Sequence, residues 1–111
     1  MELTIDTASP LASVALTEDG RLLAESSWSA GRGHATELLP AIDRLLDGAG
    51  VRRDAIGAIF VNRGPGAYAG LRVGISTALA LAFALDADLL GYGRLEADAF
   101  PFLSLGGPVC A

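Results

Sequence analysis

The chain has 111 residues, of which thirteen are acidic and eight basic, so its formal net charge is −5, and 51% of its residues are hydrophobic. This length fits one small domain, and the apolar composition excludes an intrinsically disordered chain. One cysteine and one histidine exclude a disulfide framework, a multi-cysteine zinc site and a two-histidine metal motif, while a sequence pI near 4.6 argues against solo binding of nucleic acid or of an anionic membrane.

The first part of the chain predicts three short strands joined by tight turns. Alternating apolar and polar residues predict strands over residues 2–6, 11–17 and 21–28. Between the last two strands stands Asp19-Gly20, a dipeptide favoured in two-residue hairpins. Three consecutive strands with such short connections form an antiparallel meander.

The rest of the chain alternates helices with strands. Leucine and isoleucine residues at helical spacing predict the first of these helices. The predicted elements are a helix over 34–47, a strand over 55–61, a helix over 69–85, a strand over 88–92 and the start of a helix over 95–100. This order implies an α/β fold, a mixed sheet with helices on its faces.

The sequence gives no sign of a membrane or secretion signal. Its N-terminus carries an early acid, Glu2, and no basic region before a long apolar run. The longest apolar stretch, Ile75 to Leu85, has about half of the ~20 residues that span a membrane. We therefore expect a soluble, cytoplasmic protein.

Gly64, Gly66 and Gly70 lie in the segment that joins the fourth predicted strand to the second long helix. Backbone N–H groups at a helix N-terminus can hold an anion, and glycines let the chain approach it closely. The segment lacks the lysine of a Walker A loop, and its glycine spacing is one residue longer than that of the dinucleotide-binding fingerprint. It is therefore either a phosphate or anion contact or a structural strand-to-helix turn.

Asp6 ends the first predicted strand and precedes a turn of small residues. An acid in that position suits an ATP-phosphate and metal site, but such turns usually contain glycine and this one has none. The alternative is a turn-stabilising carboxylate that accepts backbone N–H bonds. No residue is predicted to be catalytic or to ligate a metal.

The second long helix carries the strongest physical signal. At 100° per residue, Gly74, Leu81 and Leu85 point one way, which we predict to be onto the sheet. Small residues along this helix would permit close approach of another helix. A second stripe, here called the outer stripe, points nearly the opposite way and consists of Arg72, Ser76, Leu79 and Phe83. Either another helix of the domain covers this stripe or it forms a subunit interface, and we predict the interface.

Four stretches of the sequence resemble the TsaB (YeaZ) family. They are residues 3–16 with Leu-Thr-Ile-Asp-Thr-Ala-Ser and Ser-Val-Ala-Leu, residues 34–42 with His-Ala-Thr-Glu-Leu-Leu-Pro-Ala-Ile, residues 63–74 with Arg-Gly-Pro-Gly-Ala-Tyr-Ala-Gly-Leu-Arg-Val-Gly, and residues 90–97 with Leu-Gly-Tyr-Gly-Arg-Leu-Glu-Ala. The matches run in order through nearly the whole chain. One departure is Ala67-Tyr68-Ala69, where the family has Ser-Phe-Thr, so two hydroxyls that could cap the helix or hold an anion are missing.

The resemblance implies a lobe of the actin-like ATPase (ribonuclease H-like) fold over residues 1–111, ending as a second lobe begins. It implies a non-catalytic scaffold subunit, from a glycoprotease-like family, in the synthesis of N6-threonylcarbamoyladenosine in tRNA. No cofactor is implied for the chain alone, with ATP only at the level of the complex. The implied partners are the metal-bearing catalytic paralogue TsaD, the ATPase TsaE, a second copy of the chain when it is alone, and tRNA only indirectly.

Two other functions compete with the scaffold. Asp6 and the loop from Gly64 to Gly70 could belong to a catalytic actin-like lobe, an ATP-dependent phosphotransferase or carbamoyltransferase. A peptidase, a label attached to the wider family, would need a nucleophile–base pair or a metal pair, and the sequence supplies neither.

Overall fold

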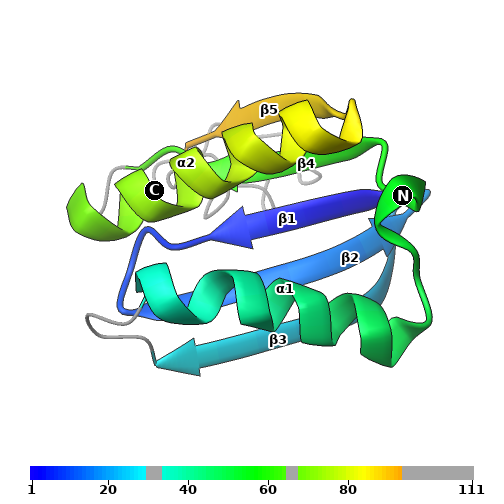
Figure 1. The fold of residues 1–111 in the computed structure, drawn as a ribbon. Coiled ribbons are helices and arrows are strands. Elements are labelled where there is room, and N and C mark those ends of the chain that lie inside the picture. The colour runs from blue at the N-terminus through cyan, green and yellow to red at the C-terminus, as the bar shows by residue number, and fades with distance from the viewer. Residues whose placement is uncertain (30–33, 65–67, 94–111) are drawn as a thin grey trace, which may run out of the picture.

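A mixed five-stranded sheet and two helices make up the computed structural model, which describes residues 1–29, 34–64 and 68–93 (Figure 1). The elements are β1 (Glu2–Asp6), β2 (Leu11–Glu18), β3 (Arg21–Ser29), α1 (His34–Ala49), the short 3₁₀ turn η1 (Arg53–Ala55), β4 (Ala58–Asn62), α2 (Tyr68–Leu85) and β5 (Asp88–Tyr92). The strand order is β3-β2-β1-β4-β5, with β2 antiparallel to both of its neighbours and β1, β4 and β5 parallel. The predicted α/β class and the three-strand meander are therefore confirmed. The helix predicted from residue 95 lies outside the described residues.

The turn between β2 and β3 has the backbone that its dipeptide predicts. Asp19 and Gly20 both have positive φ, 51° and 78°. This geometry matches the right-handed twist of the flanking strands, which is why such residues are favoured in two-residue hairpins. The hairpin therefore follows directly from the local sequence.

The strand β4 begins at Ala58, three residues later than predicted. The preceding residues form η1, in which the N–H of Ile56 donates to the carbonyl of Arg53 at 3.2 Å. Ile56 is 2% exposed, so it is buried although it follows a turn and lies outside the strand. The sequence shows only an apolar residue next to a strand and does not tell these two cases apart. The N–H of Gly57 then donates to the carbonyl of Met1 at 2.9 Å, and pairing with β1 starts at Ala58.

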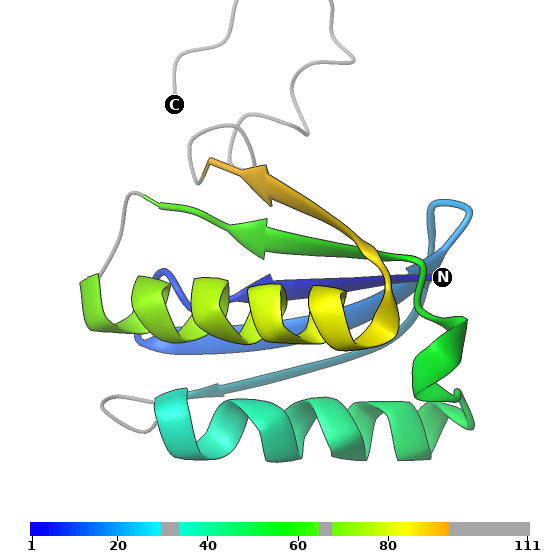
Figure 2. The same ribbon diagram turned by 45° about the horizontal axis from the view of Figure 1, so that its top comes forward.

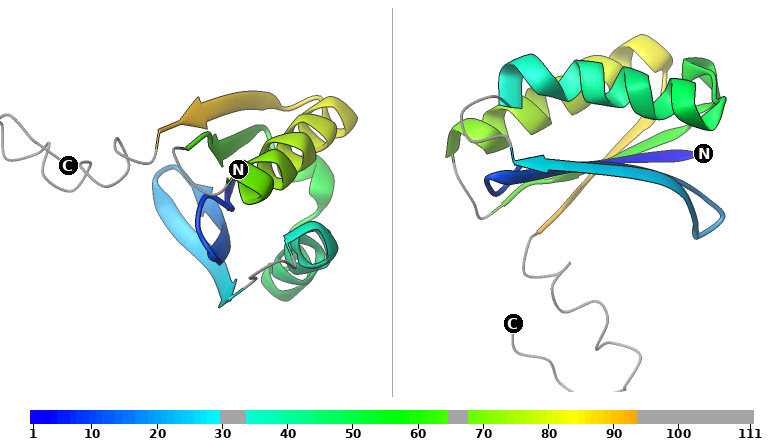
Figure 3. Two further views of the ribbon diagram at one scale, coloured as in Figure 1. Left: turned by 90° about the vertical axis from the view of Figure 1, so that its left-hand side faces the viewer. Right: turned by 90° about the horizontal axis from the view of Figure 1, so that it is seen from below.

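Both helices lie on the same face of the sheet (Figure 3), so the prediction of helices on its two faces was wrong for the described residues. The physical reason is the direction of the two crossovers. The chain steps from β3 to β4 and then from β4 to β5, always toward the same edge of the sheet. Right-handed crossovers that advance in one direction place their helices on one face. As a result α1 lies on the β3 side and α2 on the β5 side of a single helical layer (Figures 1 and 2).

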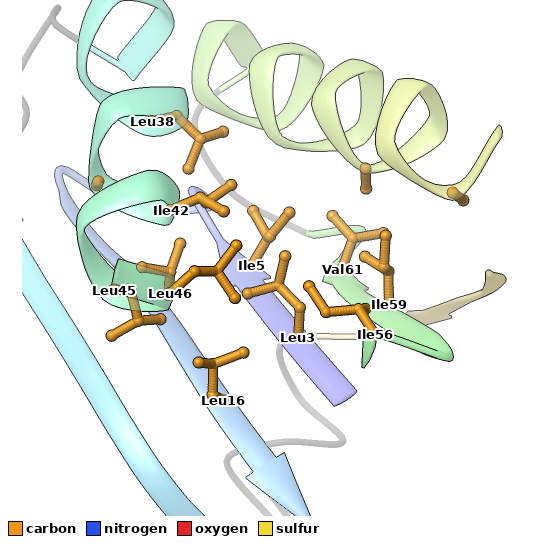
Figure 4. Packing of buried hydrophobic residues seen from close by; sticks show 14 residues of the cluster. Leu3, Ile5, Leu16, Leu38, Ile42, Leu45, Leu46, Ile56, Ile59 and Val61 are labelled. Carbon is orange, nitrogen blue, oxygen red and sulfur yellow. The ribbon is translucent and has the colours of Figure 1, made fainter. Parts of the chain in front are cut away.

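The hydrophobic core fills the space between this layer and the sheet (Figure 4). Alternate residues of the strands point into it, because successive side chains of a strand face opposite ways. The largest buried side chains come from the strands and α1, and they include Leu3, Ile5, Leu16, Leu38 and Ile59. By contrast, α2 contributes only small residues, Ala78 and Ala82, to the buried residues of the core cluster.

The face of α2 that meets the sheet includes Gly74, as predicted, but its other buried members are small residues. It runs through Gly70, Gly74, Ala78 and Ala82, at a spacing of four residues, and all of them are buried. Leu81 and Leu85 are only partly buried; they pack against the core and also line a groove of about 210 Å³ between the two helices. The small residues that we predicted to admit another helix thus bring α2 close to the sheet. Within the described residues, no helix is both long and apolar enough to cross a membrane.

Candidate functional site

The parallel strands β1 and β4 end side by side, which brings Asp6 and Asn62 together although they are 56 residues apart in sequence. Asn62 Nδ2 donates to Asp6 Oδ1 at 3.2 Å, and the N–H of Ala8 donates to the same oxygen at 3.0 Å. Asn62 Oδ1 accepts the N–H of Gly64 at 2.9 Å. We call this group, formed by Asp6, Asn62 and the N–H groups of Ala8 and Gly64, the polar clip.

The polar clip fixes the path of the chain as it leaves β4. Asn62 is 2% exposed, and a buried amide must have its donor and acceptor bonded or pay their desolvation. Both ends of this amide are used within the clip. Gly64 has a φ of 99°, a conformation that glycine adopts without steric cost. The positive φ at position 64 therefore explains why this residue is glycine, without any bound ligand.

A second contact joins the turn after β1 to the first turn of α2. Thr7 is fully buried, and its Oγ1 donates to the carbonyl of Gly70 at 2.5 Å, across 63 residues of sequence. One helical turn later, a Cβ built on Gly74 would overlap Thr7 Oγ1 and come within 3.5 Å of Thr7 Cβ. Gly74 thus makes room for the Thr7 hydroxyl. We call Thr7, Gly70 and Gly74 the Thr7 latch.

The structure brings together three of the four glycine and acid positions that the sequence singled out. Asp6 and Gly64 meet through Asn62, and Gly70 is tied to the same turn through Thr7. Gly66 lies outside the described residues. The contacts of Asp6 are those of a turn-stabilising carboxylate, since it accepts a backbone N–H two residues on. Whether an anion also binds here stays a prediction.

Two residues of this site, Thr7 and Asn62, were not predicted from the sequence. Asn62 carried a usable signal, because it is the single asparagine of the chain and stands at the end of a predicted buried strand, two residues before a glycine. Thr7 carried none, since its role depends on a helix that begins some sixty residues later. Among the residues that the structure describes, no three His, Cys, Asp or Glu side chains are grouped closely enough to hold a metal ion.

Tyr92 lies opposite Asn62 in the register of β4 and β5, next to the polar clip. Burial of the phenol, and secondarily the negative charge of Asp6, raises the pKa of Tyr92 from 10.0 to about 12. Both causes act in one direction, because each disfavours the phenolate. Below about pH 12, Tyr92 is therefore a neutral phenol in the folded chain.

We expect this pKa to make the chain lose stability between about pH 10 and pH 12. A phenol with a raised pKa in the folded state stabilises the fold below its unfolded pKa, and this contribution disappears as the pH passes the folded pKa. Absorbance at 295 nm should show one tyrosine ionising near pH 12, and Tyr92→Phe should remove that transition. Asp6→Asn should lower the pKa only modestly, because burial is the larger cause. Ionisation of both tyrosines near pH 10 would contradict the assignment.

The outer stripe of α2 is exposed. Phe83 is 92% and Leu79 54% exposed, and Arg72 and Ser76 are exposed as well. The groove toward α1 is lined by Leu81 and Leu85, and a step of two residues turns a helix by 200°. The outer stripe therefore lies on the side of α2 away from this groove and from the sheet, which Gly74 faces.

The sequence is similar to proteins of tRNA modification. The family model of TsaD, tRNA N6-adenosine threonylcarbamoyltransferase, matches residues 28–109. The chain is 31% identical over 94 residues to the tRNA threonylcarbamoyladenosine biosynthesis protein TsaB of Bacillus subtilis (strain 168), a match that covers 85% of this chain and 41% of that protein. It is 34% identical over 130 aligned positions to the tRNA N6-adenosine threonylcarbamoyltransferase of Anaeromyxobacter sp. (strain Fw109-5), with 93% of this chain and 39% of that protein covered.

Solved structures show the same similarity. YeaZ from Pseudomonas aeruginosa superposes with a TM-score of 0.79 and 37% sequence identity, over 93% of this chain and 49% of the other. The chain thus spans about half the length of this solved relative and about two fifths of the relatives matched by sequence.

Proposed function

This chain belongs to the TsaB (YeaZ) family, and from that premise we propose that it is a cytoplasmic, non-catalytic scaffold subunit in the biosynthesis of N6-threonylcarbamoyladenosine in tRNA. In this proposal the outer stripe of α2 docks on the catalytic relative TsaD, and a TsaE-like ATPase joins the same assembly. Alone, the chain pairs with a second copy of itself. It meets tRNA only through its partners.

The observation that carries the proposal is the exposure of two large apolar side chains on one helix. Phe83 and Leu79 stand one turn apart on α2 and are 92% and 54% exposed. An aromatic side chain buries roughly 150–250 Å² when a partner covers it. Aromatic residues are also enriched among the few positions that carry most of the binding free energy of an interface. A catalytic site would not need two large apolar side chains exposed to water, whereas a protein-docking surface is built from such side chains.

The contacts of the polar clip support a subunit without its own nucleotide site. The N–H groups of Ala8 and Gly64, at the turn after β1 and the turn after β4, already donate to the side-chain oxygens of Asp6 and Asn62. A phosphate group would have to displace these acceptors to use the same donors. The net charge of −5 also favours indirect contact with tRNA, because binding to a polyanion gains from basic residues.

Sedimentation velocity of the full-length polypeptide with and without TsaD tests the proposal. We expect the chain to sediment with TsaD as one species and to sediment as a dimer when TsaD is omitted. If the two proteins sediment independently over the micromolar range, the scaffold proposal fails.

The second candidate is the catalytic ATP-dependent phosphotransferase or carbamoyltransferase lobe, and one observation favours it. Asp6, Gly64 and Gly70 do meet at the carboxyl edge of the parallel strands, where ligands of open α/β sheets bind. Calorimetry with Mg-ATP on the full-length polypeptide separates the two candidates. The scaffold proposal expects no heat of binding, and a saturable heat that Asp6→Ala abolishes would favour the enzyme.

A further inference from the structure

We propose that Thr7 is a positioning residue for the outer stripe. Its buried hydroxyl, together with the bare backbone of Gly74, sets the depth at which α2 rests on the sheet and so presents Leu79 and Phe83 to the partner. Thr7 itself is fully buried and touches no partner. The effect of Thr7 on partner binding rests on the proposed function, whereas the contact between Thr7 and α2 does not depend on it.

The helix α2 fits closely against the sheet and the turn after β1. The helix faces the sheet with Gly70, Gly74, Ala78 and Ala82, all of them buried. This row carries nothing larger than a methyl group, and the larger side chains of α2 that pack against the core, Val73, Ile75, Leu81 and Leu85, are only partly buried. At the Thr7 end of the helix, the close contact with Thr7 therefore limits how near α2 can come to the sheet.

The contact between Thr7 and Gly70 accepts a hydroxyl and excludes a methyl group. Thr7 Oγ1 stands 2.5 Å from the carbonyl oxygen of Gly70, a separation that only a hydrogen bond allows. A methyl carbon in its place would need roughly 3.5 Å. Thr7→Val, which keeps the shape of the side chain, must therefore push the first turn of α2 outward by about an ångström.

The last residue of β1 and the residue after it hold the two ends of the connection between β4 and α2. Asp6 fixes the exit from β4 through Asn62 and Gly64, and Thr7, the next residue, fixes the first turn of the helix. A helix behaves as a stiff rod with a rise of about 1.5 Å per residue. Lifting its first turn therefore tilts the whole of α2 and moves the outer stripe relative to α1.

The test is a series at position 7 in the full-length polypeptide. We measure the Kd for TsaD by calorimetry well below each melting temperature, and amide hydrogen exchange over Arg72–Ile75. Thr7→Ser keeps the hydroxyl and should bind within about twofold of the unchanged chain, whereas Thr7→Ala should bind several-fold more weakly and Thr7→Val about tenfold more weakly. Exchange over Arg72–Ile75 should accelerate in the alanine and valine variants only.

A control separates positioning from general stability. Val14 is 1% exposed in β2, a strand that packs under α1. Val14→Ala should lower the melting temperature without weakening the binding of TsaD. If Thr7 were merely structural, binding would be equal in all of these variants at a temperature where each is folded.

The outcomes are distinct from those of the proposed function. Thr7→Val that binds TsaD within twofold of the unchanged chain, or that leaves exchange over Arg72–Ile75 unaltered, overturns the inference. If the unchanged chain does not bind TsaD at all, the scaffold proposal has failed instead. In that case the exchange rates alone still decide whether Thr7 holds α2.

Discussion

Gly74→Ala should destabilise the chain by about 2–3 kcal/mol, the cost of overpacking a close contact, although alanine is the better helix former. The added Cβ would overlap Thr7 Oγ1 and lie within 3.7 Å of Ile5 Cγ2, and both neighbours are fully buried. Neither can move aside without shifting α2 or β1. Urea unfolding followed by circular dichroism measures the loss.

Two further variants make this test specific. Gly48, near the end of α1, has no atom within 4 Å of an added Cβ, so Gly48→Ala should instead stabilise the chain by roughly 0.5–1 kcal/mol. Thr7→Ala combined with Gly74→Ala should be less destabilised than the sum of the two single changes, because the first removes the atom that the second overlaps. A Gly74→Ala chain as stable as the unchanged one would refute the close fit.

Phe83→Asp should release TsaD from the chain while leaving the fold intact. Replacing a central aromatic residue of an interface by a charge typically costs at least 2–4 kcal/mol of binding, which raises the Kd by about 30-fold to 1000-fold. The side chain is 92% exposed, so the free energy of unfolding should change by no more than about 0.5 kcal/mol. Sedimentation velocity with TsaD gives the first quantity and urea unfolding the second.

The matched control for this variant is Leu22→Asp. Leu22 in β3 is 56% exposed, close to the 54% of Leu79, but it lies in an edge strand and not on α2. We expect Leu79→Asp to weaken binding as Phe83→Asp does, and Leu22→Asp to leave it unchanged. Equal binding by all three variants would remove the outer stripe from the interface.

Local patterns were enough to predict most of the fold. Alternation and the Asp19-Gly20 dipeptide gave the meander, and the strand over 88–92 was confirmed at both ends. The one-sided helical layer was missed because it depends on the order of strands in the sheet, which no local pattern contains. The late start of β4 was missed because a buried apolar residue such as Ile56 looks the same in the sequence whether it lies beside a turn or in a strand.

Helical periodicity separated the two sides of α2 but did not say which apolar residues touch the sheet. The periodicity predicts Leu81 and Leu85 on the sheet-facing side together with Gly74. The structure confirms Gly74 there but places Ala78 and Ala82 beside it as the buried residues, since the helix lies so close to the sheet that larger side chains do not fit. The distance between α2 and the sheet is set by packing in the folded molecule, and helical periodicity contains no information about it.

The candidate site was predictable only in part for a related reason. Asp6 and Gly64 stand beside recognisable turns and could be singled out. The bond that joins them runs through Asn62, and it exists because β1 and β4 pair in parallel register. Such a long-range register is decided by the whole fold.

The helical layer divides the molecule into two parts that share one core. The part made of α1, β2 and β3 meets the part made of α2, β1, β4 and β5 through the ladder between β1 and β2, through the contact of the helices and through the continuous hydrophobic cluster. Proteins open locally in cooperative units, and units with many links to the rest open only at high free energy. The shape of the parallel part, which carries Phe83, therefore depends on the hairpin part remaining in place.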